Sequence, residues 1–289
     1  MSGLRTEFLG RRDEMETRHA AVLDGRTGGR GFLMALIVGS LSVYVFGLYD
    51  LGVSPVRIWQ GLDQLGTILA LMVPPSPGSH FALYLSALGQ TLSIALIGTL
   101  LAAILALPFG FLAARNVMAN RVLHIITRRG LDSVRTVDTL IWALIWINVV
   151  GLGPFAGALA IASSDFGALA KLMSEAIETA DRRPMEGVQS CGGGKFLTIR
   201  FGIVPQVLPV FASQLLYFFE SNTRSATIIG IVGAGGIGLH LYEAIRVLEW
   251  QQAAFLILMV LVTVAAIDYL SQRLRAAIIG RRDLGQRGT

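Results

Sequence analysis

The clearest shortage in this 289-residue sequence is charge, because only 15% of the residues are Asp, Glu, Lys or Arg. Soluble domains usually carry about 25% charged residues. Hydrophobic residues make up 53% of the chain and the mean hydropathy is +0.62, so a soluble fold would expose extensive apolar surface to water. These values exclude an ordinary soluble enzyme and favour a protein that lipid covers.

Cysteine and clustered reactive groups are also scarce. The single cysteine, Cys191, excludes a disulfide within the chain. The four histidines are scattered, and neither a metal-ligand spacing nor a nucleophile–base pair stands out, so we expect no metal site and no catalysis. The net charge of +5 does not indicate nucleic-acid binding, because the arginines flank apolar segments instead of sharing one polar domain.

Long apolar runs dominate what is present. A helix needs roughly 20 apolar residues to cross a hydrocarbon core about 30 Å thick, and only helical backbone satisfies its own polar groups there. The sequence therefore predicts an all-α, polytopic transmembrane bundle. The uncharged or nearly uncharged runs are 31–49, 81–114 with a kink expected at Pro108, 139–164, 203–219 and 253–270.

The run at 139–164 decides the topology, because glycines and a proline at Gly151–Pro154 interrupt it. One uninterrupted span gives five spans in all, whereas a hairpin with a second leg over about 154–178 gives six. Six spans gather most Lys and Arg on one side, as expected for cytoplasmic loops. We therefore expect about six spans with both termini cytoplasmic. The basic segments concerned are 1–30, 115–135, 171–200 and 273–287.

The same pattern predicts four parts of the chain. Residues 1–30 form a polar cytoplasmic segment, too long for the n-region of a signal peptide. Residues 31–80 hold the first span and, over 54–78, an amphipathic helix on the periplasmic surface. The core domain covers 81–275, and a cytoplasmic tail covers 276–289.

Two glycine motifs resemble nucleotide-binding loops without their context. Residues 233–238 match G-x-G-x-x-G, but a dinucleotide site needs a following strand and an acidic residue about 20 positions on, where an apolar run lies instead. The motif favours close helix packing. Residues 192–195 end in Gly-Lys, but Gln189 and Phe196 break the phosphate-loop pattern, so this chain should not bind ATP.

A polar loop between two apolar runs, residues 186–205, has a distinctive spacing. Glu186-Gly187-Val188 are followed by three residues, Gly192, nine residues and Gly202-Ile203-Val204-Pro205. This spacing resembles the EAA loop of bacterial ABC-importer permeases, with its E-A-A, glycine and I-x-L-P. The chain departs from that pattern at both alanines and at the Ile and Leu positions.

This resemblance implies a coupling helix at 184–197 that docks in a groove of a separate ATPase. Its residues would be Glu186, Gly187, Val188, Gly192, Lys195 and Pro205. Small residues allow close approach, and Gly192 allows the chain to turn sharply. Pro205 comes early in the next span, where a missing N–H costs little. An ordinary solvated loop is the alternative interpretation.

A wider resemblance covers about residues 84–275 and is to the phosphonate ABC-transporter permeases. Asp138-Thr139 depart from that family's usual Pro-Glu, which leaves the start of the third span open. The matching segments include Gln90-Thr91-Leu92, Ala113-Ala114-Arg115-Asn116, Gly151-Leu152-Gly153-Pro154, Glu175-Ala176-Ile177-Glu178, Phe219-Glu220-Ser221-Asn222-Thr223-Arg224-Ser225 and Val232-Gly233-Ala234-Gly235-Gly236-Ile237-Gly238.

The resemblance implies a type I importer permease in the cell inner membrane. Two copies of the chain would form the pore and two ATPase subunits, which hold the ATP and Mg, would dock on it. A periplasmic or lipid-anchored binding protein would deliver a phosphonate or a related phosphorus oxyanion. The expected partners are thus a second copy, the ATPases, the binding protein and membrane lipid, with no cofactor in this chain and no nucleic acid.

Ionisable and small residues late in the chain are the candidates for the pathway or gate. At i and i+4, Glu220 and Arg224 can pair on one helix face near the outer end of their span, as a gate or as a structural lock. Asp165 either lines the pore or marks a displaced fourth leg. The candidates are Glu220, Asn222, Arg224, Ser225, Gly233, Gly235 and Gly236.

Three rival functions remain open from the sequence. A permease for methionine or another small solute is possible, because the glycine-rich segment resembles that branch too. An ion-coupled secondary carrier would work without an ATPase, against which the EAA spacing argues. A membrane-embedded enzyme would need clustered catalytic residues, which the sequence does not offer.

Overall fold

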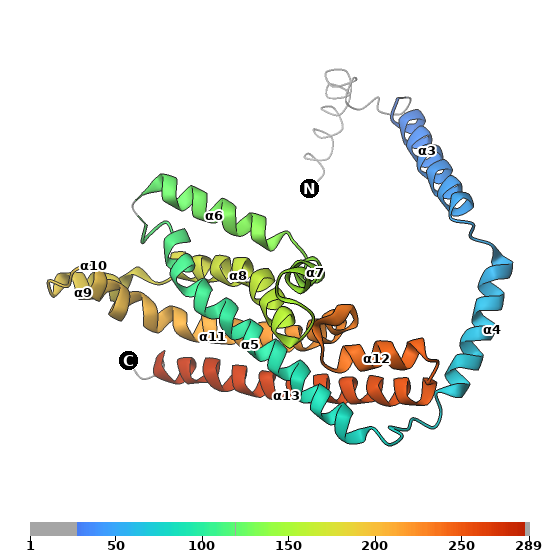
Figure 1. The fold of residues 1–289 in the computed structure, drawn as a ribbon. Coiled ribbons are helices and arrows are strands. Elements are labelled where there is room, and N and C mark those ends of the chain that lie inside the picture. Colours follow the sequence, from blue (N-terminus) through green and yellow to red (C-terminus); the bar gives the residue numbers. More distant parts are fainter. Residues whose placement is uncertain (1–27, 119, 287–289) are drawn as a thin grey trace, which may run out of the picture. The chain divides into compact units, whose positions relative to one another are not determined.

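The computed structural model describes residues 28–118 and 120–286, and these form helices joined by short connections, with no strand among them (Figure 1). The prediction of an all-α fold is confirmed. A dinucleotide site of the G-x-G-x-x-G type needs strands, so their absence from the described residues rules out that interpretation of residues 233–238. The elements are α3 (Gly28–Asp50), α4 (Pro55–Leu71), α5 (Phe81–Ala113), α6 (Arg121–Arg135), α7 (Thr139–Val150), α8 (Pro154–Glu178), α9 (Arg182–Ser190), α10 (Lys195–Leu197), the π-helical η1 (Thr198–Ile203), α11 (Val204–Ile229), the π-helical η2 (Gly230–Ala234), α12 (Ile237–Arg246) and α13 (Trp250–Gln286).

The chain divides into two compact units, Met1–Thr67 and Ile68–Thr289. In the first unit, α3 contains a 20-residue apolar stretch, long enough to cross a membrane, as the run at 31–49 predicts. The amphipathic segment expected over 54–78 is helical over α4 and buries none of its residues. The cytoplasmic segment predicted at 1–30 falls almost wholly outside the described residues.

In the second unit, α5 and α8 pack closely because small residues line their contact. Ala95, Ala102 and Ala106 of α5 are fully buried. A methyl group on Gly98 would come within 2.7 Å of Ile161 Cβ, and one on Gly110 within 2.6 Å of Met173 Cγ. Such near approach of two backbones is how membrane helices gain packing energy without a hydrophobic driving force.

The interrupted run at 139–164 forms a hairpin of α7 and α8, which turns at Gly151 (φ 92°) and Gly153 (φ 137°). The predicted turn and the second leg at 154–178 are confirmed. However, α7 has only 12 residues, about 18 Å of helix, too short to span alone. Together with α6, from which it bends by 89°, it makes at most one broken span, so the described residues hold five long helices or up to six spans.

The start of α7, which the Asp138-Thr139 departure leaves open, is fixed by a cap. Asp138 accepts a hydrogen bond from the Leu140 backbone N–H at 2.8 Å, an N-terminal cap that a carboxylate supplies well. Asn120 caps α6 in the same way, accepting from Val122 N at 3.0 Å. Each helix therefore begins where a short polar side chain satisfies its free N–H groups.

Charged contacts fasten α6 to α8. Arg128 lies 3.2 Å from Glu178, which also accepts from the Arg115 backbone N–H at 3.0 Å, and Lys171 lies 2.7 Å from Asp132. The sequence favours a solvated Glu178 or a bond to the arginines that follow it. That expectation is wrong, because α6 brings Arg128 to it from 50 positions upstream.

Glycine conformations between α11 and α12 set the direction of α12. Gly233, Gly235 and Gly236 have φ of 108°, 80° and 75°. The first N–H groups of α12 then reach α5, where Gly236 N donates to Gln90 Oε1 and Ile237 N to Thr91 Oγ1, both at 2.8 Å. The glycine motif thus serves close backbone packing inside the bundle.

The cap on α12 is testable with Thr91→Val, which keeps the side-chain shape and removes the acceptor for the buried Ile237 N–H. We expect the free energy of unfolding to fall by about 1–3 kcal/mol, measured by thermal unfolding in detergent. Ser93→Ala is the matched control, because the Ser93 hydroxyl returns to Gly89 O of its own helix at 2.9 Å. Equal melting temperatures for the two variants would contradict the cap.

Candidate coupling surface and pathway

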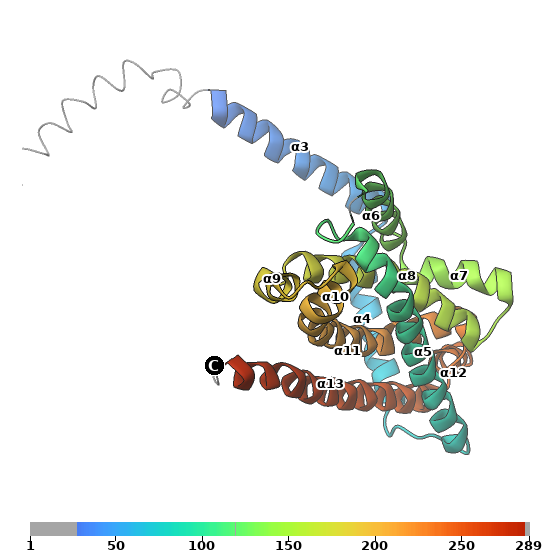
Figure 2. The same cartoon turned by 90° about the vertical axis from the view of Figure 1, so that its left-hand side faces the viewer.

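Helix α9 is a short, exposed helix at the end of the bundle where α11 begins (Figures 1 and 2). Asp181 caps it, accepting from Arg183 N at 3.1 Å. The helix ends at Ser190, and the chain then turns at Gly192 (φ 80°), whose N–H donates to Gln189 O at 2.9 Å. A single helix over 184–197 is therefore wrong: the helix covers 182–190, and a sharp turn separates it from α10.

The side chain of Gln206 clamps the start of α9 to the start of α11. Its Oε1 accepts from Asp181 N at 2.9 Å, and its Nε2 donates to Asp181 O at 3.1 Å and to Gly202 O at 2.6 Å. Gly202 itself packs on Met185 of α9, where a methyl group would meet Met185 Cγ at 2.9 Å. These contacts hold α9 rigidly against the first turns of α11.

The π-helical segment η1 explains how Pro205 sits in a helix that continues from α10. A proline inside an α-helix lacks the N–H and its ring clashes with the carbonyl four residues earlier. The wider turns of η1, Thr198–Ile203, end just before Pro205, and such π turns commonly absorb a break in the hydrogen-bond ladder. The loop motif and its proline therefore shape the junction of loop and span.

The exposed surface around α9 is partly apolar. Glu186 and Gly187 face outward, as does Lys195 on α10. Phe196 and Phe201 are 73% and 57% exposed. Beside them, a shallow depression is lined by Pro184, Gly187, Val188, Cys191, Gly193, Leu197 and Phe201. Exposed aromatic side chains next to small residues are typical of a contact surface for another protein.

The residues predicted for the pathway do not share one cavity. Glu220 does not pair with Arg224: it is 2.7 Å from Arg275 of α13, and Arg224 is 3.6 Å from Asp268 of the same helix. The i,i+4 pairing is thus replaced by two ion pairs between helices. Ser225 is half-buried and bonds weakly back to Ser221 O at 3.5 Å, while Gly233, Gly235 and Gly236 form the backbone turn before α12.

Asn222 belongs to a buried polar cluster with Asp165 and Thr99. Its Nδ2 donates to Thr99 Oγ1 at 2.8 Å and to Asp165 Oδ2. The three side chains are 4%, 8% and 1% exposed. Asp165 therefore neither lines an open pore in this conformation nor marks a displaced leg; it joins α8 to α5 and α11 inside the bundle.

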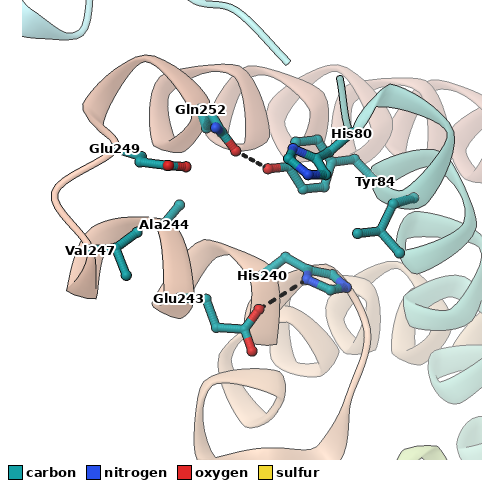
Figure 3. A pocket seen from close by; sticks show the side chains of 9 residues that line it. His80, Tyr84, His240, Glu243, Ala244, Val247, Glu249 and Gln252 are labelled. Carbon is teal, nitrogen blue, oxygen red and sulfur yellow. Dashed lines mark hydrogen bonds and ion pairs between the residues drawn. The ribbon is translucent and has the colours of Figure 1, made fainter. Parts of the chain in front are cut away.

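A pocket lies at the opposite end of the bundle from α9, where α5 and α13 begin and α12 ends. Figure 3 shows Tyr84 directed at Gln252, to which it is hydrogen bonded, and His240 directed at Glu243, 3.2 Å away. Glu249 faces the same space. The pocket is thus acidic and histidine-rich, and no group of residues that could hold a metal ion occurs in the described part of the chain.

The fold is that of a polytopic membrane permease of the importer type, and comparison with known proteins gives its family. Residues 106–282 match the model of the binding-protein-dependent transport system inner membrane component. The chain belongs to this family of inner-membrane transport components, as the resemblance to ABC-importer permeases predicts.

Individual relatives cover most of the chain. It is 35% identical over 256 residues to HtxC of Stutzerimonas stutzeri, a candidate phosphite transport system permease, covering 89% of this chain and 90% of HtxC. It is 37% identical over 247 residues to PhnE, a phosphate-import permease of Mycolicibacterium smegmatis, covering 86% of this chain and 46% of that longer protein.

The fold has a counterpart among solved structures. An inward-facing MetNI methionine ABC transporter contains a chain that matches with a TM-score of 0.62 at 18% identity, covering 70% of this chain and 99% of that chain. At this identity the match supports the fold alone. It agrees with the all-α importer permease fold expected from the sequence.

The clamp between α9 and α11 is testable with Gln206→Met, which keeps the length of the side chain and removes its hydrogen bonds. We expect amide hydrogens of α9 to exchange about fivefold faster or more, because each lost bond is worth about 1 kcal/mol. Hydrogen–deuterium exchange with mass spectrometry measures this. Gln214→Met, on the same helix, is the control; equal exchange in α9 for both variants would rule the clamp out.

Proposed function

We propose that this chain is the permease subunit of an ATP-driven type I importer that carries a phosphorus oxyanion inward. Two copies form the pathway, two separate ATPase subunits bind the ATP and Mg and dock on α9, and a periplasmic or lipid-anchored binding protein delivers the solute. The observation that carries the proposal is the exposed α9, capped, ended by a glycine turn and fastened to a membrane helix.

The mechanism follows from this fastening. ATP binding closes the two ATPases and draws the two α9 helices together, and the Gln206 clamp passes the displacement to α11. The pathway then opens outward, and hydrolysis resets it. The change is a shift between two packings of the same helices, which the ATPases bias because they bind one packing better than the other.

The position of α9 also orients the chain. With α9 in the cytosol, the Arg- and Lys-rich segments at 115–135 and 171–200 are cytosolic too, in accord with the positive-inside rule. Both termini are then cytoplasmic. The pocket of His80, Tyr84, His240 and Glu249 lies at the other end, on the periplasmic side, where the binding protein docks.

The substrate class rests on the relatives. HtxC, PhnE and the phosphite permease PtxC of Stutzerimonas stutzeri, which is 32% identical over 81% of this chain, all carry names of phosphorus-oxyanion transport. We therefore assign phosphonate, phosphite or phosphate as the solute class. A methionine or other small-solute permease is the alternative, and the binding protein's ligand separates the two.

Docking on α9 is testable with Gly187→Trp. A Cβ atom added at Gly187 meets no atom within 4 Å, so the fold should tolerate a larger residue there, and the tryptophan ring fills the space that the ATPase must enter. We expect the ATPase to bind at least about tenfold more weakly, as for loss of a well-packed contact worth roughly 1.4 kcal/mol or more. Co-purification and binding titration in detergent measure this.

The matched control is Gly66→Trp on α4, the helix expected on the periplasmic surface, where an added Cβ also meets no atom within 4 Å. It should keep ATPase binding and uptake of radiolabelled phosphate into proteoliposomes. A Gly187→Trp complex that retains its ATPase and its uptake would refute docking on α9. Uptake that proceeds without any ATPase would instead indicate an ion-coupled carrier.

A further inference from the structure

Arg224 lies at mid-depth in the bundle, not at the outer end of its span. Two residues before it, Asn222 donates to Thr99, and Thr99 lies near the middle of the 33-residue α5. Two residues of helix advance only about 3 Å. The backbone of Arg224 is therefore close to the centre of the membrane-crossing part of the bundle, and its guanidinium lies 3.6 Å from Asp268, halfway along α13.

At this depth the side chain of Arg224 is still 47% exposed in a single copy of the chain. A charged group facing lipid near the bilayer centre is costly, and such residues face a protein partner or a water-filled cavity. Its neighbours at helical spacing on the same side of α11 are Tyr217, Ser221 and Ile228, of which Tyr217 and Ile228 are 51% and 54% exposed. Lipid does not satisfy the guanidinium itself, so this part of the face calls for a protein partner or water.

The ion pair that holds Arg224 is the looser of the two between α11 and α13. Arg224 lies 3.6 Å from Asp268, and both side chains are a third to a half exposed. Among the described residues, Arg224 donates no hydrogen bond, and Asp268 Oδ1 accepts none. By contrast, Glu220 and Arg275 are 2.7 Å apart and 13% and 24% exposed. Glu220 fastens the two helices, which leaves the Arg224 guanidinium free to change partner.

We infer that the two Arg224 side chains, one from each copy of the chain, form the binding site for the phosphorus oxyanion in the translocation pathway. This inference rests on the proposed function. A guanidinium presents paired N–H donors that match two oxygens of a phosphorus oxyanion. While the anion is bound, it offsets the repulsion between the two guanidinium groups. When the anion leaves, each Arg224 pairs again with its own Asp268.

The experiment compares two substitutions that break the same ion pair. If Arg224 only ties α11 to α13, Arg224→Gln and Asp268→Asn must impair the complex alike. If Arg224 binds the anion, Arg224→Gln lowers phosphate uptake about tenfold or more, as loss of a charge-assisted hydrogen bond predicts. Asp268→Asn, which removes only the carboxylate that competes with the anion for Arg224, instead lowers the phosphate concentration for half-maximal uptake. Proteoliposomes with the ATPase, liganded binding protein and radiolabelled phosphate give the rates.

Arg129→Gln is the charge-matched control, because Arg129 is 83% exposed on α6 and far along the chain from the site; it should leave uptake unchanged. Should Arg224→Gln fail to assemble, Arg224→Lys keeps the charge without the fork, and the phosphate concentration for half-maximal uptake should rise about threefold or more. The inference is overturned if Arg224→Gln and the control take up phosphate equally, or if both variants of the ion pair lose uptake alike. It is also overturned if Arg224→Lys leaves the phosphate concentration for half-maximal uptake unchanged.

The unmodified complex separates this inference from the proposed function. If it takes up neither phosphate, phosphite nor methylphosphonate, the proposed function fails, whatever the variants do. If it takes up any of them, the proposed function stands, and the variants decide on Arg224 alone. ATPase stimulation by the liganded binding protein, retained in Arg224→Gln, excludes a general loss of assembly as the cause of lost uptake.

Discussion

The structure depends on one constraint: lipid offers no hydrogen-bond partner, so polar groups inside the bundle have to be satisfied by the protein itself, within their own helix or from another helix. The middle of α8 meets this constraint most directly, because three polar residues follow one another there at 163–165. Each takes a partner from a different position, which fixes α7 on one side of α8 and α11 on another. The contacts are Ser163 with Trp146 at 2.9 Å, Ser164 with Thr139 at 2.8 Å, and Asp165 with Asn222.

The same constraint governs the ends of helices that lie inside the bundle. Helix α12 begins among buried residues, where its first N–H groups have no partner within their own helix. The positive-φ glycines bring these groups to Gln90 and Thr91 of α5. Gly153 N also donates to Gly233 O at 3.1 Å, so the glycine turn before α8 is hydrogen bonded to the glycine turn before α12.

What the sequence could predict follows from local physics. Apolar runs, the breaks at Gly151–Pro154 and the loop spacing at 186–205 depend on neighbouring residues, and the structure has helices, a hairpin turn and a short exposed helix there. The predicted pairing of Glu220 with Arg224 was wrong because each finds a partner far along the chain. Arg224 pairs with Asp268, 44 positions away, and Glu220 pairs with Arg275, 55 positions away. Likewise Gln206 gave no local signal, because its partner Asp181 lies 25 positions upstream.

Helix α11 connects the proposed ATPase contact on α9 with the proposed anion site at Arg224. Different neighbours hold its side chains along its length. At its start, Gln206 joins it to α9. Near its middle, Glu220 is held tightly by Arg275, and one turn later Arg224 is held loosely by Asp268. A displacement that begins at α9 must therefore either break the Glu220 pair or move α13 along with α11. Because the Glu220 pair is short and mostly buried, we expect α11 and α13 to move together. In the proposed dimer, relative motion of the two copies would then change the distance between the two Arg224 side chains, while each Arg224 could still reach its own Asp268.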